Sequence, residues 1–189
     1  MRSKTLLWFT FFSVFCSYSL IAQEDTTRSK ISYFICLQTG GAFGKNGHGG
    51  SLTNALIQGV RYKRFAFGVG VGYDVHTDWK LVPFFASVNV DLLRHGAGAA
   101  YIQMNGGYSK AWAPTLSDSP LFFIQERNPY LNPLVGYRLA AGKLNVYLSA
   151  GYKFQHLTYG WTSGWSQSVT TRIERTIERI VVQLGVGFR

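Results

Sequence analysis

Cysteine, charge and long apolar runs are all scarce in this 189-residue chain. It has two cysteines, and Cys16 falls in a segment that we expect to be removed, so Cys36 has no partner for an internal disulfide. We interpret Cys36 as a small core-filling residue in preference to a reactive thiol. After Ala22 no apolar run reaches the ~20 residues that a membrane-spanning helix needs. The mature chain is therefore not expected to cross a membrane as a helix.

The low charge content is combined with many aromatic and glycine residues. Charged residues make up 15% of the chain and aromatic residues 16%, and there are 21 glycines. This combination is unusual in a soluble domain and ordinary in a membrane β-barrel. The formal net charge is +10, but Lys and Arg are scattered singly, so no basic patch indicates nucleic acid as a partner. The length suits one domain.

The N-terminus has the order of a secretory signal peptide. A positive stretch over residues 1–4 is followed by an apolar run over 6–15 and then by small and polar residues. An uncleaved anchor helix is disfavoured because the apolar run is too short, and a lipid anchor at Cys16 is disfavoured because bulky Phe15 precedes it. We predict three segments: a signal peptide over 1–22, a short N-terminal periplasmic segment over 23–30, and an outer-membrane β-barrel over 31–189.

The clearest strand signal lies between Phe65 and His76. Every odd position there is a large apolar or aromatic residue, and every even position is small or polar. A period of two predicts a β-strand with two unlike faces. The small face has too little volume to build a soluble core, so the apolar face must meet lipid. A soluble barrel of the lipocalin type is the alternative, but its water-facing side would carry many Lys and Glu instead of Gly and Ala.

The same alternation recurs along the chain and predicts eight strands, each long enough to cross a bilayer with tilt. The predicted fold class is all-β, an eight-stranded antiparallel up-and-down transmembrane β-barrel. Ile57 alone falls on the wrong face of its strand. Residues 172–180 also fit a helical stripe, but we prefer a strand because the segment that follows must cross the membrane. The expected strands lie within residues 33–41, 52–63, 65–76, 87–92, 101–107, 131–140, 144–155 and 180–188.

Tight links are expected on one side of the predicted barrel, at 63–64, 94–96 and 141–143. The links on the other side are 42–51, 77–79, 113–128 and 157–171; of these 77–79 is short and the last two are the longest. Short periplasmic turns and longer outer loops are typical of outer-membrane barrels. Interfacial belts favour Trp and Tyr, whose rings are apolar and whose polar tips reach water. Five such residues are expected at or beyond the long-loop ends of strands: Trp79, Trp112, Tyr159, Trp161 and Trp165.

Three motifs carry a resemblance to a known group: GYRL at 136–139, YLSAGYK at 147–153 and GVGFR at 185–189. With them, the chain resembles the small outer-membrane β-barrel proteins of the OmpA/OmpX-like class, in particular the porin-like variety common in Bacteroidetes. The resemblance implies localisation in the cell outer membrane. It also implies recognition by barrel-assembly machinery, although Arg189 after the aromatic Phe188 departs from that signal. Such motifs are specific for architecture and nearly silent on activity.

The inward face of the predicted barrel carries several charged residues. An eight-stranded barrel is just wide enough for side chains to fill its interior, and an unpaired buried charge costs several kcal/mol. We therefore predict two layers of ion pairs that close the lumen, with a small pore for ions or solutes as the alternative. The members of this lumen polar network are Arg61, Asp91 and Arg138 near the periplasmic end, and Asp74, His76, Lys153 and Gln155 toward the outer end.

Asp74 and His76 also raise the possibility of an enzyme. A carboxylate can orient a histidine that acts as a general base, and His156 and three serines are expected near the same rim. An outer-membrane hydrolase or lipid A-modifying enzyme is the weaker alternative, because a two-residue match is unspecific and the local motifs of lipid A deacylases and palmitoyl transferases are absent. The spacing of His48, His76 and His156 does not support a metal site. We expect no catalytic residue, metal or cofactor.

The predicted function is a structural or surface-interaction role in adhesion or in the cell envelope. The expected partners are outer-membrane lipid, lipopolysaccharide and, during biogenesis, the barrel-assembly machinery. An extracellular ligand is expected at the outer loops, 113–128 and 157–171, which mix aromatic and charged residues.

Overall fold

The computed structural model describes residues 31–44, 50–76, 80–112, 122–124, 128–163 and 169–189, without the side chains of 112, 122–124, 159–163 and 169–172. Residues Ile31–Arg189 form one compact unit. The predicted signal peptide, the predicted periplasmic segment 23–30 and His48 lie outside the described residues. No helix in the described part of the chain is long and apolar enough to cross a membrane.

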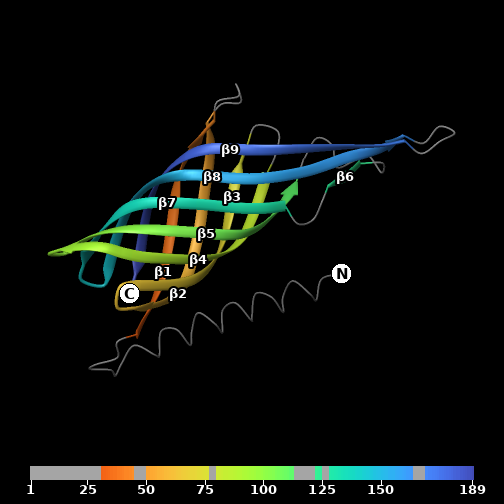
Figure 1. Cartoon of the computed structure of the whole chain (residues 1–189). Helices are drawn as coiled ribbons and strands as arrows, with labels where there is room; N and C mark the ends of the chain where they lie inside the picture. Colours follow the sequence, from red (N-terminus) through yellow and green to blue (C-terminus); the bar gives the residue numbers. More distant parts are fainter. Residues whose placement is uncertain (1–30, 45–49, 77–79, 113–121, 125–127, 164–168) are drawn as a thin grey trace, which may run out of the picture. The chain divides into compact units, whose positions relative to one another are not determined.

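Eight antiparallel strands close into an up-and-down barrel in the order β1-β2-β3-β4-β5-β7-β8-β9, and β9 pairs back onto β1 (Figure 1). A short ninth strand, β6, pairs with β8. The bounds are β1 Ile31–Phe43, β2 Ser51–Tyr62, β3 Phe65–Val75, β4 Lys80–His95, β5 Gly98–Trp112, β6 Phe122–Ile124, β7 Asn128–Ala141, β8 Leu144–Ser163 and β9 Val169–Phe188.

The predicted barrel of eight strands is confirmed, and residues 172–180 are strand. The prediction of a loop over 157–171 is wrong for most of its length, because β8 runs on to Ser163 and β9 begins at Val169. The predicted loop 113–128 contains β6, which pairs with residues 159–161 of β8. Figure 1 shows β8 and β9 continuing together past the ends of the other strands. Beyond the lipid both faces of a hairpin meet water, so the apolar alternation that marks a membrane strand is lost there.

Three two-residue turns lie at one end of the barrel, which we call the turn end, and the opposite end is the loop end. The turns are Lys63-Arg64, Gly96-Ala97 and Gly142-Lys143, as the tight links predict. The first residue of each turn has a positive φ: 53° at Lys63, 55° at Gly96 and 63° at Gly142. Glycine adopts this conformation without strain, and Lys63 is the exception.

The strands are staggered around the barrel. Cys36 of β1 pairs with Gly187 of β9. The pairing can also be traced from Cys36 around the barrel in the other direction, one strand at a time. This path reaches Ile177 of β9, ten residues from Gly187, and its steps are Ile57, Gly70, Phe85, Gly107, Tyr130 and Gln155. Such a stagger tilts the strands and brings inward residues of distant sequence to the same height.

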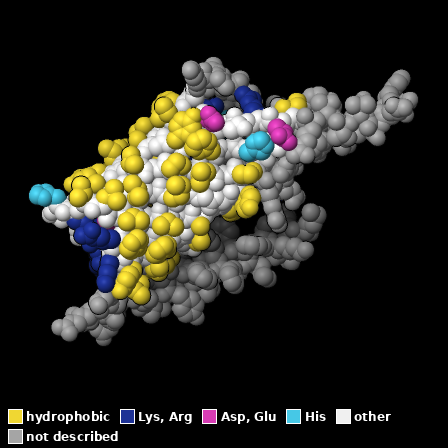
Figure 2. Space-filling view, in the orientation of Figure 1, with side chains coloured by type: hydrophobic (Ala, Val, Ile, Leu, Met, Phe, Trp, Pro, Cys, Tyr) yellow, Lys and Arg dark blue, Asp and Glu magenta, His cyan; other side chains and the backbone are white. Residues whose placement is uncertain are grey.

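The outward face of the barrel is an apolar belt. In β3 the exposed fractions are 50% for Phe67, 60% for Val69, 39% for Val71 and 40% for Tyr73. The other barrel strands expose Val, Leu, Ile and aromatic residues in the same way, and Figure 2 shows them side by side over one face. A soluble protein does not leave so large a continuous apolar surface in water. The lipocalin alternative is therefore wrong, since it requires these side chains to face inward.

The inward face is filled by polar side chains and by a few rings. Phe85 packs beside Tyr130, with ring centroids 5.4 Å apart, and Tyr101 meets Tyr147 edge to face at 6.0 Å. The small inward residues make room for such rings, since a Cβ on Gly70 would lie 2.5 Å from the ring of Phe85. Ile57, which the alternation places on the inward face, is indeed buried there. The glycine-rich face of the sequence is thus the space that inward aromatic residues occupy.

Candidate functional site

Most charged side chains of the lumen form two separate clusters, apart from Arg179 of β9, which donates to the carbonyl oxygen of Ala42 and to Ser51 Oγ. The first cluster lies at the turn end. Its centre is Asp91 of β4, whose side chain is fully buried. Arg61 of β2 reaches it through Nη1, 3.1 Å from Oδ1 and 3.0 Å from Oδ2. Arg138 of β7 donates from Nη2 to Oδ2 at 2.8 Å. Both arginines are themselves buried, so the carboxylate is what compensates their charge away from water.

A third arginine, Arg94, reaches the same carboxylate from the turn side. Its Nε and Nη2 lie 3.1 Å and 2.8 Å from Oδ2 of Asp91, and Nη2 also donates to the carbonyl oxygen of Lys63. The pairing of β4 with β5 shifts register between Asp91 and Leu93. This bulge leaves Leu92 and Leu93 both outward and re-aims the chain that follows. We call these four residues, Asp91 with Arg61, Arg94 and Arg138, the Asp91 cluster.

The second cluster lies toward the loop end and is centred on Asp74 of β3. Its Oδ1 accepts from Lys153 Nζ at 2.7 Å and from Thr53 Oγ1 at 2.6 Å. Gln155 Nε2 donates to Oδ2 at 2.8 Å, and Lys153 Nζ also lies 2.7 Å from Thr53 Oγ1. Lys153 further lies 5.8 Å from the centroid of the Tyr130 ring, a cation–π distance. We call Asp74, Lys153, Thr53 and Gln155 the Asp74 cluster.

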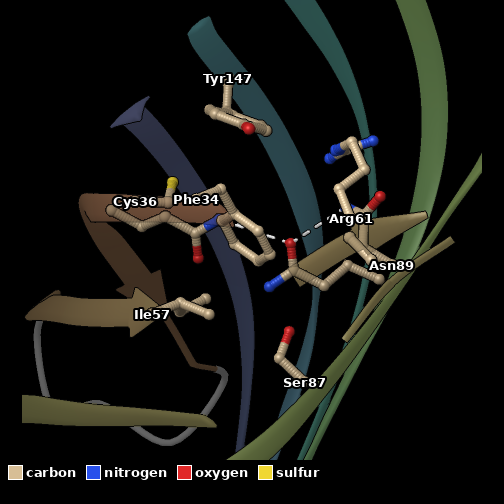
Figure 3. Close-up of a pocket in the computed structure, with 10 residues that line it drawn as sticks. Phe34, Cys36, Ile57, Arg61, Ser87, Asn89 and Tyr147 are labelled. Carbon is tan, nitrogen blue, oxygen red and sulfur yellow. Dashed lines mark hydrogen bonds between the residues drawn. The ribbon is translucent and has the colours of Figure 1, made fainter. Parts of the chain in front are cut away.

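Between the clusters lies a level of neutral amides. Gln38 Nε2 of β1 is 3.4 Å from Gln103 Oε1 of β5, and Gln103 Nε2 donates to Asn105 Oδ1 at 2.9 Å. A small cavity here has room for about one water molecule. Figure 3 shows Cys36, Tyr147 and Asn89 among the residues around it. Cys36 is a buried free thiol, as expected of a core-filling residue.

At all three levels the contacts span the barrel from wall to wall. In the circle of eight strands, β3 stands opposite β8, β1 opposite β5, and β2 opposite β7. Lys153 thus meets Asp74 across the full lumen, and Gln38 meets Gln103 in the same way. At the turn end, Arg61 and Arg138 come from opposite walls and share the carboxylate of Asp91. The lumen is therefore crossed by direct side-chain contacts at three heights.

His76 and His156, which the enzyme alternative would combine, do not come together. His76 is buried on the inward side directly after β3. His156 lies on the outward face of β8, where its Nδ1 is 3.3 Å from Thr176 Oγ1. The ring of His76 faces inward and that of His156 faces outward, so the two do not meet.

The structure places all seven residues of the predicted lumen network on the inward face, six of them in the two clusters and His76 beside Asp74. Sequence reasoning missed Arg94 and Thr53 as members of the clusters. The broken alternation at Leu92-Leu93 is the signal that could have indicated the bulge that brings Arg94 to Asp91. Of the predicted interfacial aromatics, Trp79 and Trp165 lie outside the described residues, and the side chains of Trp112, Tyr159 and Trp161 are outside the description too.

No group of three or more His, Cys, Asp or Glu side chains suited to a metal ion occurs among the residues that the structure describes. The three serines expected near the rim are Ser163, Ser166 and Ser168. Ser163 ends β8 without a described side chain, and the other two lie outside the described residues. In the two clusters the lumen offers charges that are engaged with one another.

Comparison with known proteins gives a match in fold only. No family model matches the chain, and no curated protein does. Among solved structures, Neisserial surface protein A is similar, with a TM-score of 0.58 and 17% identity over 85% of this chain and 97% of that chain. The translocator domain of the autotransporter NalP from Neisseria meningitidis aligns over 98% of this chain and 97% of that chain with 12% identity and a TM-score of 0.30. The first match supports the barrel fold, and the resemblance to OmpA/OmpX-like barrels of Bacteroidetes stays a prediction.

Proposed function

We propose that this chain is an integral outer-membrane β-barrel whose lumen is closed by its own side chains and whose role is structural or surface interaction. The observation that carries the proposal is the set of wall-to-wall contacts at three heights of the lumen. A conducting pore needs a continuous water-filled path, and each of these contacts occupies the axis. The closed lumen leaves the outer surface and the loop end as the places where partners bind.

The apolar belt and the predicted signal peptide both support a location in the outer membrane. An antiparallel barrel satisfies every backbone group within its own wall, which is what a bilayer requires. Its apolar belt faces outward in every barrel strand. A secretory signal peptide and a spanning barrel together favour the outer membrane. The structure similar to it in fold is described as a surface protein, which agrees with this assignment.

The hairpin extension supports the surface role. It consists of residues 156–163 of β8, residues 169–179 of β9, and β6. The pairing of β1 with β9 ends at Phe43 and Ile180, but β8 and β9 stay paired to Ser163 and Val169. The extension therefore rises beyond the barrel wall, with β6 as a third strand beside β8. Its exposed side chains include Glu174 and Glu178, unlike the apolar belt below. Such a polar sheet suits contact with a partner outside the membrane.

Planar-bilayer recording tests the closed lumen. Purified full-length chain, refolded and inserted into the bilayer, is expected to give no stable conductance, because three contact levels block the axis. An open porin in the same bilayer is the positive control. Stable and reproducible conductance steps from the purified protein would contradict the closed-lumen proposal and favour the small pore.

Shortening the hairpin extension tests the surface role. Leu157 and Arg175 face each other in the register of β8 and β9, so residues 158–174 can be replaced by an Asn-Gly turn, which suits two-residue hairpins. The barrel is expected to fold, shown by its heat-dependent shift on SDS gels, and cells carrying it are expected to lose adhesion or envelope integrity. Unchanged adhesion and unchanged envelope permeability, with the variant present at wild-type levels, would remove the surface role.

We assign no catalytic role to Asp74 and His76. Both carboxylate oxygens of Asp74 are engaged by Lys153, Thr53 and Gln155, and His156 faces outward. His76→Ala leaves the ion pair of the Asp74 cluster in place and is the test variant. Lipid A mass spectra and peptide-cleavage profiles of cells carrying it should match those of wild type, and a change in either would restore the enzyme alternative.

A further inference from the structure

The exposed charged side chains that the structure describes at the turn end have one sign. Each link at this end carries at least one cation: Lys63 and Arg64 lie between β2 and β3, Arg94 lies at the end of β4, and Lys143 lies between β7 and β8. All four side chains are exposed. Among the residues that the structure describes, no exposed Asp or Glu lies at this end. We call Lys63, Arg64, Arg94 and Lys143 the basic ring.

The carboxylate nearest to the basic ring does not neutralise it. Asp91 is fully buried and is shared by Arg61, Arg138 and Arg94. One negative charge therefore meets three positive ones, and the surplus at this end of the barrel is positive. The carboxylate of Asp91 partly compensates the charge of Arg94. It does not compensate the charges of Lys63, Arg64 and Lys143, which contribute to the positive charge of the basic ring.

The basic ring stands directly next to the apolar belt. Tyr62 and Phe65, which flank the first turn, are 41% and 47% exposed on the outward face. The Lys63 ammonium lies 5.2 Å from the centroid of the Tyr62 ring. Interfacial tyrosines sit at the depth of lipid headgroups, so a cation stacked on one lies at the depth of the phosphates. Figure 2 shows Lys and Arg side chains gathered beside the apolar surface at the turn end.

The loop end differs, which makes the basic ring a feature of one side only. Exposed Glu174 and Glu178 lie on β9 there, together with Lys110 on β5. Charges of both signs are thus mixed at the loop end, whereas they are uniformly positive at the turn end. A rim of positive side chains at the depth of the headgroups is complementary to the negatively charged headgroups of anionic lipids.

We propose that the basic ring binds the phosphate groups of anionic phospholipids in the leaflet at the turn end. The inference rests on the proposed membrane location and deepens it, because it assigns a lipid class to one rim of the barrel. Lysine and arginine each contribute about 1 kcal/mol to binding an anionic membrane surface. The preference for anionic lipid is therefore set by a few side chains, and the turn end is anchored at one leaflet.

Lipid selectivity of the reconstituted chain is the test. Full-length protein is placed in phosphatidylcholine vesicles with a minority of phosphatidylglycerol, and spin-labelled analogues of the two lipids report their relative association with the barrel. Wild type is expected to prefer phosphatidylglycerol, and added NaCl is expected to weaken that preference. The variant Lys63→Asn/Lys143→Gln should lose at least about fivefold in the preference. Asparagine tolerates the left-handed backbone at position 63.

The matched control removes two lysines at the other end. Lys80→Gln/Lys110→Gln lowers the net charge equally, and both residues lie on the outward face near the loop end. This control should keep the wild-type preference. If it loses as much as the turn-end variant, or if the turn-end variant keeps the preference, the proposal is wrong.

Two further arms keep the outcome decisive. Arg64→Gln/Lys143→Gln replaces the first variant if Lys63→Asn disturbs folding, since Arg64 has an ordinary backbone conformation. Carbonate extraction of the vesicles tests the premise: a chain that washes off overturns the proposed membrane location itself. A chain that stays inserted but shows no lipid preference overturns only the basic ring.

Discussion

The two charged clusters of the lumen each compensate a buried carboxylate, but with different partners. In the Asp91 cluster one carboxylate is shared by three guanidinium groups. In the Asp74 cluster one carboxylate meets a single ammonium, and a hydroxyl and an amide complete its hydrogen bonds. The Asp91 cluster therefore carries excess positive charge, whereas the Asp74 cluster is a single ion pair with two neutral hydrogen-bond donors.

The difference shows how each end of the barrel depends on its carboxylate. At the turn end, Asp91 is the compensating charge for two buried arginines from opposite walls, so the packing of β2 and β7 depends on it. Toward the loop end, Lys153 keeps a hydroxyl and an aromatic ring as neighbours even without Asp74. Removing a carboxylate should therefore have unequal effects at the two ends.

Asp91→Asn is expected to have the largest effect. It keeps the size of the side chain but leaves Arg61 and Arg138 buried without a carboxylate. Breaking a buried ion pair by removing one partner costs about 3–5 kcal/mol, and here two buried cations lose the same partner. Urea unfolding of the refolded barrel measures the free energy of unfolding. Asp74→Asn is the matched variant and should cost less, and an equal or greater loss there would remove the distinction between the clusters.

A double-mutant cycle on Asp74 and Lys153 should show an ion pair that can be removed as a unit. Lys153→Met alone is expected to cost about 3 kcal/mol, because it leaves Asp74 buried without a cation. The double variant Asp74→Asn/Lys153→Met should cost less than the sum of the single changes by about 1–3 kcal/mol. Urea unfolding of the four proteins gives this coupling energy.

The same cycle at the turn end provides the contrast. The double variant Arg61→Met/Asp91→Asn still leaves Arg138 buried without a carboxylate, so little of the loss is recovered. A coupling energy as large as that between Asp74 and Lys153 would show that the Asp91 cluster also behaves as a simple pair.

The arginines of the Asp91 cluster should rank by burial. The side chain of Arg138 is 11% exposed and that of Arg94 is 45% exposed. Arg138→Gln is expected to cost about 2 kcal/mol, because it removes a charged hydrogen bond inside the lumen. Arg94→Gln should cost about 1 kcal/mol or less, since water screens an exposed pair. Unfolding in urea compares the two, and a larger loss for Arg94 would mean that the rim of the barrel, rather than its interior, holds the cluster together.

The faces of the strands could be predicted from the sequence, but the partners across the lumen could not. Alternation with a period of two places Asp74 and Lys153 on the inward side, whatever the details of pairing. Whether they meet depends on the stagger of the strands, since β3 and β8 stand on opposite walls. Nothing local in the sequence encodes that stagger. Arg94 was missed for a related reason, because the bulge after Asp91 changes the parity on which the assignment of faces rests.

The sequence does not predict the strands of the hairpin extension within residues 157–171, for a different reason. Residues 157–171 were expected to form a loop because they lack the apolar and small alternation of a membrane strand. Beyond the lipid a strand needs no apolar face, so residues 157–163 and 169–171 form strands without that alternation. Pairing with β8 over the whole of β9 then sets the conformation. The pattern that identifies a strand thus changes with the solvent around it.

The neutral level between the clusters should matter least. Across the lumen Gln38 makes a long hydrogen bond of 3.4 Å to Gln103, and its Oε1 has no hydrogen-bond partner among the described residues. Gln38→Met keeps the length of the side chain and removes a buried amide whose bonds are incomplete. Its effect on the free energy of unfolding is expected to stay within about 1 kcal/mol in either direction. A loss as large as that of Asp91→Asn would show that wall-to-wall contact itself, and not charge compensation, stabilises the barrel, and the contrast between the two clusters would then be secondary.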